Sequence, residues 1–144
     1  MVFPCFRAFY LFWKNEEAEI FLDTSGETLA KHGYRRLPGT APMLEALAAA
    51  TILSTKWDKN APFVNPMCGS GTLAIEAALI ATNRVPGLLR NNYAFMHILG
   101  YDKAMYEIEN VKLKEQIIKL PGLKIIASDI SKRAIETAKT NAEV

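Results

Sequence analysis

The sequence has few cysteines and no strong excess of one charge. Its two cysteines, Cys5 and Cys68, show neither a CxxC spacing nor a neighbouring histidine cluster, which argues for reduced thiols and against a zinc site or a disulfide. With 17 Lys and Arg against 15 Asp and Glu, the net charge is only +2. Charge of this size does not by itself indicate nucleic-acid binding. We expect a cytoplasmic protein without a metal.

Long hydrophobic runs are missing as well. The apolar start, Met1 to Trp13, carries Arg7 in its middle and is not followed by a small-residue cleavage site. The runs Ala46–Leu53 and Ala77–Ala81 are far shorter than the roughly 18 residues that a membrane span needs. We therefore expect neither export nor membrane insertion. The 144 residues are 50% hydrophobic, which is enough for one core without a disulfide or metal.

Residues 1–38 are predicted to form a short β-hairpin and a linker. Two apolar runs, Phe9–Trp13 and Glu19–Leu22, flank a polar turn. The tetrapeptide Asp23-Thr24-Ser25-Gly26 predicts a further turn, and a basic loop from Lys31 to Arg36 leads to Pro38-Gly39. We place a domain boundary there, so residues 39–144 form the second unit.

The second unit alternates between helix and strand patterns, which indicates a parallel α/β arrangement. So few strands make only part of a nucleotide-binding sheet, and we expect an incomplete domain. The predicted elements are a helix capped by Thr40 and running to about Thr55, a buried strand Ala61–Val64, a helix Ser70–Ala81, an irregular stretch Arg84–Gly100, a helix from about Lys103 to Leu120, a buried strand Leu123–Ala127, and a last helix capped by Ser131.

The sharpest local signal lies between the first predicted parallel strand and its helix. Residues 65–72 read Asn65-Pro66-Met67-Cys68-Gly69-Ser70-Gly71-Thr72. The two glycines permit a tight turn and close approach of a ligand, and the following helix offers unpaired N–H groups. This pattern suits an adenosine cofactor, although an ordinary strand-to-helix turn accounts for it equally well.

Asp129 follows the next predicted strand, where a carboxylate can accept hydrogen bonds from ribose hydroxyls. A helix-capping or turn aspartate is the alternative. It lies 64 residues beyond Asn65, against about 20 in the general dinucleotide pattern. The intervening segment must therefore contain an insertion.

Three other chemistries fail on residue type. Gly71-Thr72-Leu73 lacks the lysine of an NTPase phosphate loop. The Asp23 turn has its glycine one place too late for an aspartic protease, and a second such carboxylate is missing. Nothing in the sequence pairs Cys68 with either His32 or His97, so a nucleophilic role for the thiol is improbable.

Two further groups have open interpretations. The basic loop with Lys31, His32, Arg35 and Arg36 around Tyr34 could contact phosphate and stack on a base, but a solvated surface loop is the commoner explanation. The aromatic residues Tyr93, Phe95 and Tyr101 could line a base pocket, but such residues more often pack in a core.

Together these motifs resemble a known family. The segments 23–35, 41–49 and 65–78 are similar to the THUMP-associated RNA guanine-N2 methyltransferases, whose members are often labelled N6-adenine-specific DNA methylases. The likeness extends from about Phe21 to Ala142. It implies a partial Rossmann-like class I methyltransferase domain that uses S-adenosylmethionine, preceded by the hairpin, with Pro66 to Thr72 as the cofactor loop and Asp129 as the ribose ligand.

The resemblance adds one site candidate and one departure. The helix over Ala41–Ala50 is expected near the methionine end of the cofactor, which makes Glu45 a candidate. The family usually has Asp where this chain has Asn65, so the affinity for the cofactor is expected to be reduced. The expected partner of the complete family is ribosomal or transfer RNA, bound through an upstream THUMP domain. The resemblance implies that residues 1–38 are the remnant of the connection to that domain and that residues 39–144 are the N-terminal half of the methyltransferase domain.

The catalytic Asn/Asp-Pro-Pro-aromatic motif of the family is also absent, and Asn65-Pro66-Met67-Cys68 does not replace it. In the family this motif is expected to hold the exocyclic amine of a flipped base. We therefore expect a fragment of an RNA methyltransferase that is inactive alone, with no catalytic residue assigned. The alternative is a nonenzymatic nucleotide-binding or interaction module that a partner chain completes.

Overall fold

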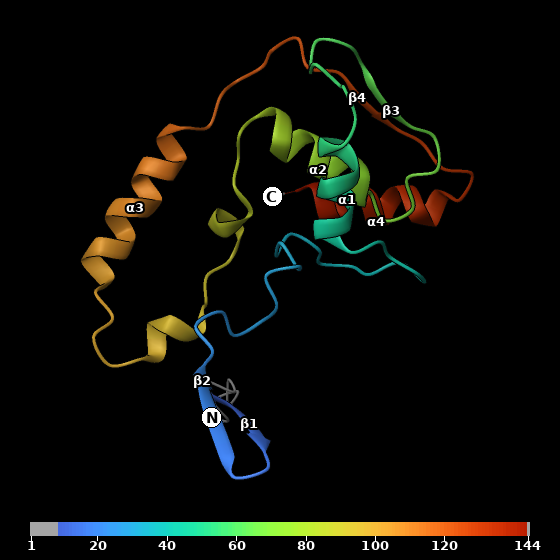
Figure 1. Ribbon diagram of the computed structural model, residues 1–144. Helices are drawn as coiled ribbons and strands as arrows, with labels where there is room; N and C mark the ends of the chain where they lie inside the picture. The colour runs from blue at the N-terminus through green and yellow to red at the C-terminus, as the bar shows by residue number, and fades with distance from the viewer. Residues whose placement is uncertain (1–8, 144) are drawn as a thin grey trace.

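The architecture is a protruding hairpin followed by a small α/β unit (Figure 1). The computed structural model describes residues 9–143, so Cys5 and Arg7 lie outside the described part. The elements in chain order are β1 (Phe9–Lys14), β2 (Glu17–Leu22), α1 (Glu45–Leu53), β3 (Phe63–Asn65), α2 (Thr72–Ala81), the 3₁₀ helices η1 (Pro86–Leu89) and η2 (Ala94–His97), α3 (Lys103–Glu115), β4 (Ile125–Ala127) and α4 (Lys132–Ala142).

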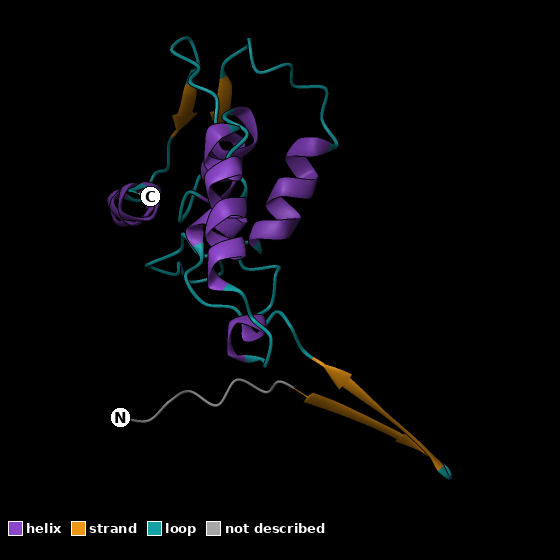
Figure 2. Ribbon diagram, turned by 90° about the vertical axis from the view of Figure 1, so that its left-hand side faces the viewer, coloured by secondary structure: helices purple, strands orange, loops and turns teal. Residues whose placement is uncertain are grey.

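Strands β1 and β2 form the predicted antiparallel hairpin, which projects away from the helices (Figure 2). Strand β2 begins two residues earlier than expected, because Glu17 pairs with Lys14 across the turn. All residues of both strands are exposed. The predicted turn follows, with Asp23 Oδ1 accepting hydrogen bonds from the backbone N–H groups of Ser25 at 2.8 Å and Gly26 at 3.2 Å.

Strands β3 and β4 pair in parallel, with Val64 opposite Ile126, which confirms the α/β class. Helix α2 packs against both strands. The expectation that both strands are buried is wrong, because Val64 is 58% and Ile126 51% exposed. Paired residues lie on the same side of a sheet. These two side chains therefore mark the face that no described element covers.

Two helix boundaries differ from the prediction by about five residues each, while helix α2 begins two residues later than predicted and α1 ends about two residues earlier. Helix α1 begins at Glu45, and Thr40 does not cap it. Its early N–H at Ala46 is instead satisfied by the carbonyl of Ala30 at 3.2 Å, which removes the need for a side-chain cap. Helix α3 ends at Glu115 rather than Leu120, since the N–H of Ile118 turns back to the carbonyl of Thr82 at 2.9 Å.

The centre of the core is formed by Tyr34, Ile75 and Leu79, with Leu89 packed against them. Helix α1 lies along α2, and α4 crosses near the start of α2. Helix α3 stands apart on the far side of the segment that follows α2 (Figure 1). Among residues 9–143, no helix combines the length and apolar character that crossing a bilayer requires.

Candidate functional site

The glycine loop, residues 65–72, connects β3 to α2. The N–H of Cys68 donates to the carbonyl of Ser128 at 2.9 Å, and the N–H of Gly71 donates to the carbonyl of Cys68 at 2.8 Å. Gly69 and Gly71 have φ values of +52° and +87°, in the region that glycine adopts without strain. The loop therefore takes a conformation that these two glycines make accessible.

Gly71 also allows a close helix crossing. A Cβ atom there would lie 3.0 Å from Cβ and 3.2 Å from Cα of Ala138 on α4. Any side chain at position 71 would push α4 away from the loop. The second glycine thus serves packing as well as backbone conformation.

Asp129, which follows β4, is brought directly onto this loop. Its Oδ2 accepts a hydrogen bond from the N–H of Gly69 at 2.9 Å, and its Oδ1 accepts one from the N–H of Ser131 at 2.9 Å. The backbone N–H groups of Ser131 and Gly69 hold the pKa of the Asp129 carboxyl below its usual value. The carboxylate therefore anchors the glycine loop. It also stabilises the turn before α4, as expected for the turn aspartate that was the alternative to a ribose ligand.

Asn141 is a second anchor, which sequence reasoning missed. The residue is fully buried, and its Oδ1 accepts from the N–H groups of Arg36 at 2.9 Å and Leu37 at 2.8 Å. Its Nδ2 donates to the carbonyls of Leu37 at 2.9 Å and Ser70 at 3.0 Å. All four hydrogen-bonding positions of the amide are used, so α4 holds both the glycine loop and the preceding segment.

For the basic segment, residues 31–36, the solvated-loop interpretation is right for the exposed Lys31 and Arg36 and wrong for Tyr34. Tyr34 is only 1% exposed, and His32 Nδ1 lies 2.7 Å from Oε1 of the buried Glu76 on α2. Burial, and next to it the Glu76 carboxylate, hold the pKa of Tyr34 far above its usual range. Burial likewise raises the pKa of Glu76. Tyr34 is therefore part of the core, and it anchors a segment whose basic ends stay exposed.

Arg35 links the candidate Glu45 to the glycine loop. Its Nε lies 3.4 Å from Glu45 Oε1, and its Nη2 donates to Thr72 Oγ1 at 3.1 Å. Glu45 is 3% exposed, yet its second oxygen, Oε2, has no hydrogen-bond partner. The buried Nδ2 of Asn65 has none either. An acceptor and a donor are thus left unsatisfied near the loop, and unpaired buried polar atoms are costly.

The remaining loop residues divide between the surface and the interior. Cys68, Ser70, Gly71 and Thr72 are buried, whereas Pro66 and Gly69 are exposed. Met67 is 84% and Ile130, directly after Asp129, 103% exposed. Sequence reasoning did not single out Ile130. Apolar side chains this exposed, close in the chain to Gly69 and to Asp129, are available to a ligand.

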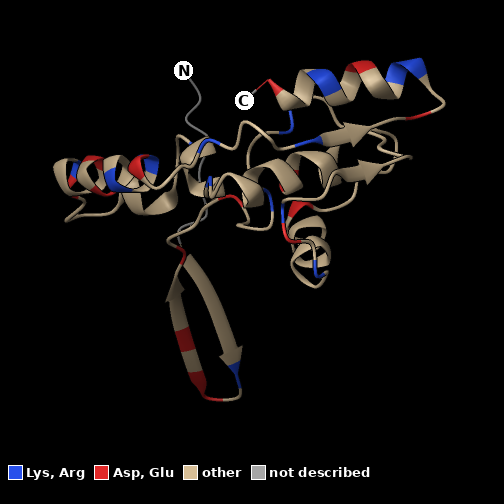
Figure 3. Cartoon of the chain, turned by 90° about the horizontal axis from the view of Figure 1, so that it is seen from above, with Lys and Arg blue, Asp and Glu red and all other residues tan. Residues whose placement is uncertain are grey.

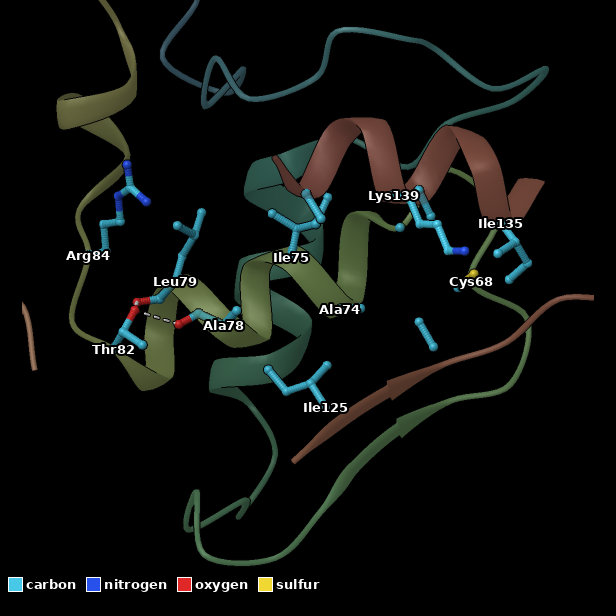
Figure 4. Close-up of a pocket in the computed structure, with 14 residues that line it drawn as sticks. Cys68, Ala74, Ile75, Ala78, Leu79, Thr82, Arg84, Ile125, Ile135 and Lys139 are labelled. Atoms are coloured by element: carbon cyan, nitrogen blue, oxygen red, sulfur yellow. Dashed lines mark hydrogen bonds between the residues drawn. The ribbon is translucent and has the colours of Figure 1, made fainter. Parts of the chain in front are cut away.

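Cys68 lies at the rim of an apolar pocket of about 450 Å³ between α2 and α4 (Figure 4). Burial, followed by the nearby Asp129 carboxylate, raises the pKa of the Cys68 thiol. A raised pKa disfavours the thiolate, which is the nucleophilic form. The structure therefore supports the dismissal of Cys68 as a nucleophile.

The aromatic residues that follow α2 pack against one another. The Tyr93 and Phe95 rings are stacked at 5.2 Å, and Phe95 also contacts Tyr101 and Tyr106 at 5.8 Å and 5.7 Å. Such clusters stabilise a segment by ring packing. The structure therefore supports a packing role for these half-buried rings, in a cluster separate from the central core.

A polar cleft of about 690 Å³ borders the glycine loop on the side of α4. Gly69 and Ser70 form one part of its wall, residues 37–42 another, and Ser131 and Arg133 a third. The glycine loop thus lies next to a cleft and to the Asp129 carboxylate, an arrangement typical of ligand-binding sites.

The comparisons with known proteins identify the domain. The model of the family described as RMKL-like, methyltransferase domain, matches residues 32–144. The chain belongs to this family. The match includes residues 32–36 of the basic segment, the glycine loop, Asp129 and Asn141.

Three solved structures have the same fold. SMU.472, named as a candidate methyltransferase and solved in complex with SAH, is 40% identical, with a TM-score of 0.79 over 87% of this chain and 32% of its own. A protein named as a predicted N6-adenine-specific DNA methylase from Listeria monocytogenes is 40% identical, with a TM-score of 0.80 over 87% of this chain and 33% of its own. A protein named as a possible methylase from Clostridium difficile 630 is 36% identical, with a TM-score of 0.82 over 94% of this chain and 35% of its own. The chain thus spans about a third of each of these proteins.

Proposed function

We propose that this RMKL-like domain binds S-adenosylmethionine and belongs to a methyltransferase that acts on guanine N2 of ribosomal or transfer RNA. The observation that carries the cofactor assignment is the hydrogen bond from Gly69 N–H to Asp129 Oδ2 at 2.9 Å. It joins the glycine loop and the carboxylate in one place, although they are far apart in the sequence. The related SMU.472, which was solved with SAH, supports the same assignment.

The residues around this contact fit an adenosine cofactor. Each oxygen of Asp129 accepts one backbone hydrogen bond, and a carboxylate has about four acceptor positions, so two remain for ribose hydroxyls. The lowered pKa of Asp129 keeps the carboxylate ionised near neutral pH. Met67 and Ile130 supply apolar surface for the adenine ring. The domain would thus hold the nucleoside by one carboxylate and two apolar flanks.

The unsatisfied polar atoms fit the amino-acid end of the cofactor. Glu45 Oε2 would accept from its ammonium group, and Asn65 Nδ2 would donate to its carboxylate, which would satisfy both orphaned atoms. Arg35 would hold Glu45 in position through the 3.4 Å contact. When bound, S-adenosylmethionine supplies a methyl group activated on a sulfonium.

The acceptor part of the proposal rests on the sequence resemblance to guanine-N2 methyltransferases. The relative named as an N6-adenine-specific DNA methylase shares the acceptor chemistry, because guanine N2 and adenine N6 are both exocyclic amines. No Asn/Asp-Pro-Pro-aromatic motif occurs in the 144 residues. We therefore propose that these residues bind the cofactor without transferring its methyl group.

Calorimetric titration with S-adenosylhomocysteine tests the cofactor assignment. We expect saturable binding that weakens at least about tenfold in Asp129→Ala, since a tenfold loss corresponds to about 1.4 kcal/mol. Asp58→Ala is the matched control, because Asp58 also accepts two backbone hydrogen bonds, from Asn60 and Ala61, in a loop away from the site. Absence of binding by the folded chain, or an equal loss in both variants, would refute the assignment.

The acceptor is tested by incubating the chain with S-adenosylmethionine and ribosomal RNA, followed by mass spectrometry of the digested nucleosides. We expect no methylated product. Formation of N2-methylguanosine would support the acceptor and refute the inactivity of the isolated chain. N6-methyladenosine would refute guanine as the acceptor.

A further inference from the structure

The segment between α2 and β4 contains a pocket that the proposed cofactor site does not use. It has a volume of about 180 Å³ and lies between η1 and α3. Its polar lining residues are Arg90, Asn91, Tyr106, Asn110 and Lys114, and no carboxylate lines it. The lining thus contains two cationic side chains and no acidic one. This is unusual for a chain with nearly equal numbers of basic and acidic residues.

Arg90 is held in a fixed position on three sides. Its Nη2 donates to the carbonyl of Glu27 at 2.8 Å, and its guanidinium carbon lies 4.6 Å from the centre of the Tyr93 ring. Gly33 leaves room for its stem, since a Cβ at position 33 would lie 2.9 Å from Arg90 Cγ. The remaining Nη1 is buried and has no hydrogen-bond partner. Fixing the side chain removes most of the entropy cost of binding a ligand through Nη1.

Lys114 provides a second cation from α3. It is exposed and takes part in no ion pair among residues 9–143, whereas Lys112, two residues earlier, lies 2.6 Å from Glu109. A guanidinium, an ammonium group and two amides that line one pocket supply the kinds of donor that bind a tetrahedral oxyanion. Carboxylates would be expected in the lining if the pocket served a cationic or metal ligand.

We propose that this pocket binds a phosphate group of the RNA backbone, with Arg90 Nη1 and Lys114 as the charged donors. The identity of the polyanion rests on the proposed function, whereas the anion chemistry rests on the pocket itself. Phosphate contacts fix the position and orientation of a nucleic acid without reading its sequence. The pocket would therefore position the RNA chain on the side of the domain that carries α3.

The test is fluorescence anisotropy with a labelled single-stranded RNA of about 12 nucleotides over a range of salt concentrations. We expect Lys114→Gln to weaken binding about three- to tenfold and to reduce the salt slope by about 0.7, the value for one lost contact to a single strand. Lys112→Gln is the matched control, because it removes the same charge from the same helix outside the pocket. We expect it to change neither quantity.

Arg90→Lys distinguishes a positioned fork from charge alone. It keeps the charge and removes the second donor edge, so we expect RNA affinity to fall as in Lys114→Gln. Because Arg90 also donates to the Glu27 carbonyl, the variant could lose stability. Its RNA affinity is therefore compared with that of the wild type only if both have the same thermal unfolding midpoint. An Arg90→Lys variant that binds RNA with wild-type affinity would overturn the role of Nη1.

Three outcomes would overturn the proposal. Unchanged RNA binding in Lys114→Gln would show that the pocket holds no backbone phosphate, and equal losses in Lys112→Gln would show diffuse charge attraction. Preferential binding of a glutamate-rich peptide, with the same dependence on Lys114, would assign the pocket to a protein partner. Competition by inorganic phosphate tests whether free phosphate occupies the pocket. A DNA strand of the same sequence tests whether the pocket distinguishes RNA from DNA.

The proposed cofactor function is tested separately by S-adenosylhomocysteine titration of the same variants. Loss of RNA binding with unchanged S-adenosylhomocysteine affinity is the expected result for Lys114→Gln. A chain that fails to bind S-adenosylhomocysteine but shows the Lys114-dependent RNA binding would refute the cofactor function and leave the phosphate pocket intact.

Discussion

The hairpin and the basic segment show opposite relations between composition and burial. The hairpin is rich in aromatic and aliphatic residues, yet Tyr10 is 55% and Trp13 70% exposed. The basic segment at 31–36 carries four basic side chains, yet its Tyr34 is 1% exposed. Burial is thus decided by the partners that the fold brings together, because composition alone would rank these two regions the other way.

The physical reason lies in what faces each region. The hairpin places Phe9, Leu11, Trp13, Ile20 and Leu22 on one face, according to its register, and no described element covers them. Its second strand also carries acidic residues (Figure 3). The basic segment instead meets Glu45, Glu76 and Asn141, which pair with its polar groups. Side chains of a polar segment can approach a core that offers such partners.

The largest expected difference between the two regions is in the stability cost of replacing a tyrosine in each. We expect Tyr34→Ala to reduce the free energy of unfolding by about 3 to 5 kcal/mol, as for other fully buried aromatics. Tyr10→Ala should cost less than about 1 kcal/mol, the value of a cross-strand pair with Phe21. Urea denaturation of both variants measures the difference. A cost above about 2 kcal/mol for Tyr10→Ala would show that the hairpin is covered in solution.

A glycine pair separates backbone strain from close packing. Gly71→Ala should cost about 2 to 4 kcal/mol, because φ is +87° and the new Cβ would lie 3.0 Å from Ala138 Cβ. Gly100→Ala has a similar φ of +93° but no atom within 4 Å, so it should cost only about 1 kcal/mol. Thermal unfolding monitors both. Equal costs would mean that α4 moves aside without penalty.

A smaller effect concerns the pH dependence of the buried acid. Because burial raises the pKa of Glu76 above 4.5, the protonated form contributes stability that is complete below pH 4.5 and is lost as the pH rises through the folded-state pKa. Glu76→Gln removes this titration. We expect the wild type to lose stability relative to the variant as the pH rises from 4.5 through the folded-state pKa, by about 1.4 kcal/mol for each unit of pKa shift.

Urea denaturation at several pH values measures this effect, and Glu19→Gln in the exposed hairpin is the control. The control should follow the wild type throughout that range. A wild type that gains stability with rising pH relative to Glu76→Gln would show that pairing with His32 outweighs burial.

The glycine loop was predictable because its determinants are adjacent in the sequence. Gly69 and Gly71 stand between a strand pattern and a helix pattern, and the loop formed there. Asp129 was singled out by its place after a predicted strand, but its spacing argued against pairing with the loop, and only the resemblance supplied that pairing. Asn141 could not be found, because a polar residue near the end of an amphipathic helix normally indicates solvent. Its only signal is that it shares a helix face with Ile135 and Ala138.

Helix boundaries were missed for a related reason. Helix α1 obtained its first hydrogen bond from Ala30, and the chain after α3 was drawn back to Thr82. Neither contact leaves a mark in the local pattern, so capping rules placed the start at Thr40 and the end at Leu120. Tertiary hydrogen bonds override local preference at such ends.

The anchoring of the glycine loop by Asp129 and Asn141 also has a consequence for biosynthesis. The Gly69–Asp129 contact spans 60 residues, so the loop leaves the ribosome about 3 to 12 s before its anchor at normal elongation rates. Contacts between distant residues form late, because the chain must first close a long loop. In a nascent chain, the loop around Gly69 and Gly71 would therefore lack its final conformation until α4 has emerged. The ligand site would be among the last parts of the domain to fold.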